Sequence, residues 1–166
     1  MRPGQDRHEV GEAVVELLYP EGGGHLRGIT LGTPVAEVTA REGAPRLVDG
    51  TAELDFPLDD PFENGRRVLV RIHQQIARTH QVAAFFSSRD RLDVDSAYRL
   101  VRKHLQGVHG RPDQEKTGVL KFVYTLKDSP HPAKTSVCRY KNDAGDNVLE
   151  VATRPDGELR FQGGLR

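Results

Sequence analysis

Cysteine, tryptophan and methionine are nearly missing from this sequence. The 166 residues include one cysteine, Cys138, one methionine and no tryptophan. A single thiol excludes an internal disulfide, which suits a protein of a reducing compartment. A chain of this length can bury a substantial core without cross-links. We therefore expect one domain spanning residues 1–166.

Long apolar runs are also missing. No segment approaches the ~18 apolar residues that cross a bilayer, and the first residues lack the apolar stretch of a secretory signal peptide. We therefore expect a cytoplasmic protein with no membrane partner.

The sequence has no surplus of either charge. Lysine and arginine total 24, aspartate and glutamate also total 24, and the formal net charge is zero. Nucleic-acid-binding proteins usually carry a basic surplus or stripe. This balance argues against a nucleic-acid partner. Hydrophobic residues make up 36% of the chain, which is too apolar for a disordered protein of high net charge.

The first half of the chain reads as helices followed by strands. Residues 6–19 are predicted to be an amphipathic helix, with Asp6 and Glu9 spaced as in a capping box. Thr33 is expected to cap a short second helix, with Pro34 at its first position and its end at Gly43. Alternating apolar residues then predict strands at 51–58 and 67–73, and a third strand is expected to end near the apolar residues 82–86.

The second half repeats this order. A helix capped by Asp95 or Ser96 is expected to end at Gly110, and strands are predicted at 120–126, 135–141 and 148–153. Asp156-Gly157 has the composition of a hairpin turn leading to a last strand. The pattern predicts an α+β fold with two tandem helix–antiparallel-strand units, at about 6–88 and 89–166. Together the units would form one sheet with helices on one face.

The first short helix and its exit carry a family resemblance. The segment Gly28-Ile29-Thr30-Leu31-Gly32-Thr33-Pro34-Val35-Ala36-Glu37-Val38, with Gly43-Ala44-Pro45 and the antiparallel strands after it, resembles the repeat unit of the β-lactamase-inhibitory-protein superfamily. It is also similar to the related small lipoprotein of outer-membrane β-barrel assembly. The resemblance implies a concave sheet that binds a partner protein. The single cysteine departs from both the disulfide-bonded inhibitor and the lipidated protein.

Motifs that would indicate a reaction are not found. His104 and His109 lie five residues apart on the predicted helix, and His73 and His80 would point to opposite faces of an unbroken strand, so neither pair predicts a metal site. Cys138 is interpreted as a small buried residue rather than a nucleophile. We expect no cofactor, no metal and no catalytic residue.

The strand face turned away from the helices is the candidate binding surface. Leu54, Phe56, Val68, Val70, Phe122 and Tyr124 are expected to face the helices. The residues expected on the other face are Glu53, Asp55, Leu69, Arg71, His73, Lys121, Val123, Arg139, Lys141 and Arg160. Arginine and apolar side chains together are typical of protein interfaces. The residues predicted to bind a partner are Phe62, Leu69, Arg71, His73, Lys121, Val123, Arg139 and Lys141.

Three functions agree with these observations. The first is a non-enzymatic inhibitor or bacterial immunity protein that blocks a toxin or an enzyme through the open sheet face, as a monomer or homodimer. The second is a secretion or assembly chaperone that binds an extended segment. The third is an enzyme or carrier of a small ligand, which would require a deep pocket.

Overall fold

The computed structural model describes residues 7–48, 52–58, 65–116 and 119–162. Within these ranges the chain forms three α-helices, one short 3-10 helix and eight strands. The helical elements are α1 (Arg7–Leu18), η1 (Leu26–Gly28), α2 (Val35–Glu42) and α3 (Arg91–His109). The strands are β1 (Arg46–Val48), β2 (Glu53–Leu58), β3 (Gly65–Gln75), β4 (Arg78–Ser88), β5 (Gln114–Lys116), β6 (Lys121–Leu126), β7 (Ala133–Lys141) and β8 (Asn147–Pro155).

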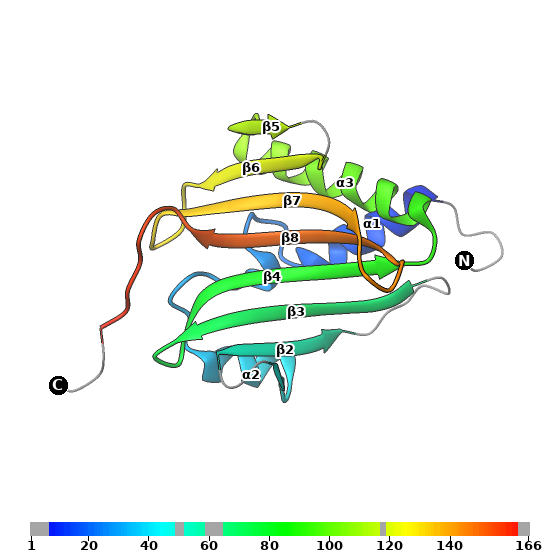
Figure 1. The fold of residues 1–166 in the computed structure, drawn as a ribbon. Coiled ribbons are helices and arrows are strands. Elements are labelled where there is room, and N and C mark those ends of the chain that lie inside the picture. Colours follow the sequence, from blue (N-terminus) through cyan, green and yellow to red (C-terminus); the bar gives the residue numbers. More distant parts are fainter. Residues whose placement is uncertain (1–6, 49–51, 59–64, 117–118, 163–166) are drawn as a thin grey trace.

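All described strands join one open antiparallel sheet in the order β1-β2-β3-β4-β8-β7-β6-β5. Each half of the chain contributes a run of sequential neighbours, and the two runs meet where β4 pairs with β8 at the middle of the sheet (Figure 1). The short strands β1 and β5 form its two edges. The expected α+β class and the single antiparallel sheet are confirmed.

The helices pack against one face of this sheet. In Figure 1, α1 and α3 lie behind it and α2 lies beside β2 and β3. One apolar cluster joins helices and strands from both halves of the chain. The six residues expected to face the helices all belong to it: Leu54, Phe56, Val68, Val70, Phe122 and Tyr124. Alternation along the strands therefore assigns their inner face correctly.

Two helix starts differ from the sequence prediction. Thr33 does not cap α2: its hydroxyl lies 3.0 Å from that of Thr30, and Pro34 occupies the cap position. Helix α3 starts before Asp95, because the carboxylate of Asp90 accepts a hydrogen bond from the backbone N–H of Leu92 at 3.0 Å. The expected capping box of α1 begins at Asp6, which lies outside the described residues.

The segment after β8 also departs from expectation. Residues 158–162 form no strand and run as an irregular segment. Phe161 lies against the rings of His80 and His131, and His80 Nε2 lies 2.8 Å from the carbonyl oxygen of Leu159. Side-chain contacts rather than sheet pairing hold this segment.

Strands β3 and β4 are joined by an unusual two-residue turn. Ile76 and Ala77 have φ angles of 53° and 56°, in the left-handed region that glycine and asparagine favour. The reversal brings His73 and His80 together, with ring centroids 5.9 Å apart, rather than on opposite faces of an unbroken strand.

No helix in the described part of the chain is both long enough and apolar enough to cross a membrane.

Candidate functional site

The sheet face opposite the helices holds the candidate site. A single row of paired residues crosses it from edge to edge, since residues directly opposite in neighbouring strands share a face. From β1 to β5 the row reads Arg46, Asp55, Arg71, Ala83, Ala152, Ser136, Val123 and Gln114. The three residues at its middle, Ala83, Ala152 and Ser136, have small side chains. Small side chains there leave the centre of the face lower than its surroundings.

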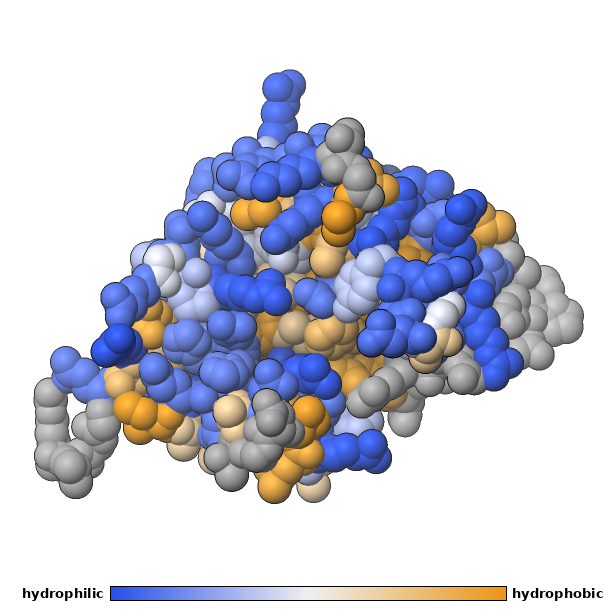
Figure 2. All heavy atoms as spheres, viewed as in Figure 1, coloured by the Kyte–Doolittle hydropathy of each residue, from blue (hydrophilic) through white to orange (hydrophobic). Residues whose placement is uncertain are grey.

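Three hollows lie along this face. One of about 150 Å³ is lined by Ala83, Phe85, Ala152 and Arg71, among others. A second of about 120 Å³ lies over Leu69 and also touches Arg71 and Phe85. A third, of about 510 Å³, lies over strands β5 to β8. Figure 2 shows the face, with apolar residues near its middle and hydrophilic side chains around them.

Arg71 stands between the two smaller hollows. Its Nε and Nη2 donate hydrogen bonds to the two carboxylate oxygens of Asp55 at 2.7 and 3.0 Å, and its guanidinium carbon lies 5.4 Å from the ring centre of Phe85. Asp55 is almost completely buried, while the Arg71 side chain keeps about a third of its surface exposed, at 32%. The hydrogen bonds from Arg71 to Asp55 raise the pKa of the guanidinium. Arg71 is therefore charged and held in place, which limits the side-chain entropy lost on binding.

A second set of polar contacts lies on the β7–β8 part of the face. Tyr140 donates a hydrogen bond from its hydroxyl to Glu150 at 3.0 Å, Glu150 lies 3.6 Å from Arg154, and Arg154 donates to the hydroxyl of Ser136 at 3.4 Å. Burial, followed by the negative charge of Glu150 and the hydrogen bond to it, raises the pKa of Tyr140. Tyr140 is a hydrogen-bond donor here and not a phenolate.

Cys138 pairs directly with Glu150 on the same face and is partly exposed. Burial is the main cause that raises the pKa of its thiol, and the carboxylate of Glu150 adds to the effect. A thiol with a raised pKa holds little of the reactive thiolate at neutral pH. The expectation of a buried cysteine is wrong, because Cys138 is only partly buried.

Five of the predicted binding residues lie on this face: Leu69, Arg71, His73, Lys121 and Val123. Two do not. Arg139 pairs with Leu149 of the core and contacts Asp95 and the ring of Tyr98 on α3, and Lys141, two residues further on, shares its side of the strand. Phe62 lies outside the described residues. Arg160, expected outward on a last strand, lies in the irregular segment after β8.

Sequence reasoning missed several residues of this face. The missed residues are Ala83, Phe85, Ala152, Glu150, Arg154 and Tyr140. Residues 82–86 are all apolar, so they predict a strand but not which side chains face outward, and the turn at Ile76 and Ala77 lacks the residues that would have marked the start of β4. The cross-strand register that unites the row has no local sequence signal.

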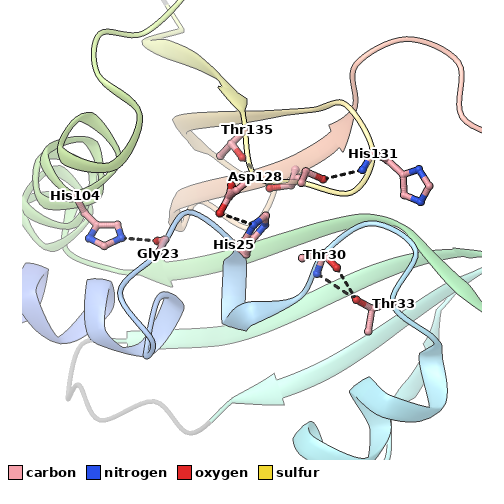
Figure 3. A network of polar contacts seen from close by, with 10 residues as sticks. Gly23, His25, Thr30, Thr33, His104, Asp128, His131 and Thr135 are labelled. Carbon is pink, nitrogen blue, oxygen red and sulfur yellow. Dashed lines mark hydrogen bonds and ion pairs between the residues drawn. The ribbon is translucent and has the colours of Figure 1, made fainter.

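A group of histidines lies where the glycine-rich loop meets α3 (Figure 3). His104 Nε2 lies 2.8 Å from the carbonyl oxygen of Gly23, and His25 Nε2 lies 3.2 Å from a carboxylate oxygen of Asp128. These contacts attach the glycine-rich loop to α3 and to the segment after β6. Among the described residues, no group of three or more histidine, cysteine, aspartate or glutamate side chains could hold a metal ion.

Comparison of the chain with protein-family models, with curated proteins and with solved structures finds no match in any of the three.

Proposed function

We propose that this chain is a non-enzymatic protein-binding module that blocks a partner protein, such as a toxin or an enzyme, through the open face of its sheet. The observation that carries the proposal is the small-residue row at the middle of that face, flanked by the immobilised guanidinium of Arg71. Protein interfaces favour apolar centres with arginine and aromatic anchors, and Arg71 over Phe85 supplies both.

The arrangement of the strands supports two tandem units as the basis of this face. Each half contributes a helical segment and then four sequential strands, and the halves meet through their last strands, β4 and β8. This order agrees with the expected resemblance to the inhibitory-protein superfamily. In this proposal, both units contribute to one binding surface.

The chemistry of the face supports binding rather than catalysis. The pKa values of Cys138 and Tyr140 are raised, so neither side chain is ionised at neutral pH. Arg71 is held by Asp55 in a pair that fixes its position. The hollows around Arg71, of about 150 and 120 Å³, are small for an enclosed ligand site.

The test begins with capture of the partner from lysate of the source cells, followed by affinity measurements with the purified pair. Ala83→Arg places a long side chain in the central hollow, and Phe85→Ala removes the ring beneath Arg71. Each is expected to weaken binding at least tenfold, about 1.4 kcal/mol. The control is Leu92→Arg, at a half-exposed position on the first turn of α3. Unchanged affinity in folded Ala83→Arg and Phe85→Ala proteins would show that the open face is not the binding surface.

A further inference from the structure

The largest hollow on the open face has a chemistry of its own. It is a groove of about 510 Å³ over strands β5 to β8. Its lining includes Asp113, Lys121, Val123, Thr125, Lys134 and Arg154. Arg154 also lines the 150 Å³ hollow beside Arg71, so the groove adjoins the centre of the face.

Positive charge dominates this groove. Lys121 on β6, Lys134 on β7 and Arg154 on β8 supply three cations from three adjacent strands. A fourth, Lys116 on β5, lies directly opposite Lys121 in the register. Two like charges directly opposite each other in a sheet destabilise it. An anion bound between them would relieve that repulsion.

The ion pairs that the cations of the groove make with nearby carboxylates are weak. Lys134 pairs with Asp156 at 3.1 Å and Arg154 with Glu150 at 3.6 Å, and both cationic side chains are about half exposed. Exposed ion pairs of this kind contribute only about 0–1 kcal/mol, so an incoming carboxylate can replace them. Asp113, the acidic residue of the lining, accepts a hydrogen bond from the hydroxyl of Thr125 at 2.8 Å.

We propose that this groove binds an extended, acidic segment of the partner polypeptide. The inference rests on the proposed function and adds the chemistry of the partner. Lys121 lies at one end, and Lys134 and Arg154 lie at the other, beside Thr125. Four residues along β6 separate the two ends, about 13 Å in an extended strand. An extended segment with carboxylates four residues apart matches this separation, and Val123 provides apolar contact between the two ends.

The groove suits a polypeptide better than a nucleic acid. Single-stranded nucleic acids bind to grooves in which aromatic rings stack on the bases, and none of the described residues that line this groove is aromatic. The zero net charge of the chain also provides no wider positive field for a phosphate backbone.

The test uses a capped hexaglutamate peptide as the probe, titrated at low salt into the full-length, isotope-labelled chain and followed by amide chemical shifts. A hexathymidylate oligonucleotide is the second probe. The variant is Lys121→Glu with Arg154→Glu, which reverses the charge at both ends of the groove. The control is Arg99→Glu with Lys103→Glu, which makes the same change in net charge on the exposed side of α3.

The proposal predicts hexaglutamate-induced shifts centred on strands β6, β7 and β8. It also predicts at least a tenfold weaker affinity in the groove variant and an affinity within threefold of the unmodified chain in the control variant. Shifts that are spread over the whole surface, equal affinities in both double variants, or binding of hexathymidylate without binding of hexaglutamate would overturn it. None of these outcomes alters the proposed function, which the Ala83→Arg and Phe85→Ala variants test with the partner itself.

Discussion

Arg71 donates hydrogen bonds from Nε and Nη2 to the two carboxylate oxygens of Asp55, at 2.7 and 3.0 Å. Asp55 is almost completely buried beneath the open face. A buried carboxylate on the uncovered side of a sheet is costly unless a cation and hydrogen bonds accompany it. The pair therefore fixes the position of Arg71 and places a carboxyl group in the interior.

This relationship predicts an asymmetric response to truncation. Arg71→Ala removes the cation facing a buried carboxylate, and we expect it to lower the free energy of unfolding by about 3–5 kcal/mol. Asp55→Ala leaves a guanidinium that water can reach, and we expect a smaller loss of about 1–2 kcal/mol. Urea unfolding of both variants and of the double variant measures the coupling. Equal losses that simply add would contradict the account.

The turn between β3 and β4 predicts a stabilising substitution. Ile76 and Ala77 have φ angles of 53° and 56°, each unfavourable for a residue with a side chain of this kind. Ile76→Asn with Ala77→Gly provides the sequence that a two-residue turn of this type favours. We expect the free energy of unfolding to rise by about 1–2 kcal/mol. A variant whose urea midpoint is unchanged or lower would show that the turn is not strained.

Gly24 and Gly23 form a matched pair for testing the loop contact with α3. A Cβ atom on Gly24 would lie 2.2 Å from Nε2 of His109, whereas one on Gly23 would have nothing within 4 Å. Gly24→Ala should therefore lower the free energy of unfolding by about 1–3 kcal/mol. Gly23→Ala should change it by less than about 1 kcal/mol. Thermal unfolding of the two variants measures these changes. Equal losses of stability in both would contradict the close approach of Gly24 to His109.

His109 predicts a loss of stability in mild acid. Its pKa is lowered, chiefly by burial, and the nearby His25 and His104 lower it further while Asp128 opposes them. As the pH decreases below the ordinary histidine pKa of about 6.5, the unfolded chain takes up a proton that the folded chain does not. The free energy of unfolding therefore decreases as the pH is lowered from about 6.5 to the lowered pKa of His109 in the folded chain. His109→Gln should flatten this part of the profile, measured by urea unfolding between about pH 7.5 and 5.0. An unchanged slope in the variant would contradict the assignment.

The sequence predicted the helices and strands better than it predicted which strands lie next to each other and in what register. Alternation placed Phe56, Val70 and Phe122 on the covered face, because side-chain direction in a strand is a local property. It failed for Arg139, whose face depends on pairing with Leu149 of the adjacent strand. Register between strands distant in the chain depends on tertiary packing, which no window of residues contains.

The residues at the centre of the candidate site could not be predicted from the sequence for a related reason. The turn at Ile76 and Ala77 lacks the glycine or asparagine that normally marks a two-residue hairpin, so the start of β4 gave no signal. The role of Ala83 and Ala152 emerges only when the two strands lie side by side at the middle of the sheet. A small residue in one strand does not predict a hollow in the sheet face unless the residue paired with it in the next strand is known to be small as well.

The most direct test of the central claim uses the single thiol of the chain as a reporter of the open face. The alkylation rate of Cys138 is measured with and without the captured partner. The same measurement is made on a thiol introduced by Val108→Cys in a Cys138→Ser background, at an exposed position on α3. The account predicts that the partner slows alkylation of Cys138 at least tenfold and leaves the thiol on α3 unchanged. Protection of the α3 thiol with no change at Cys138 would contradict it.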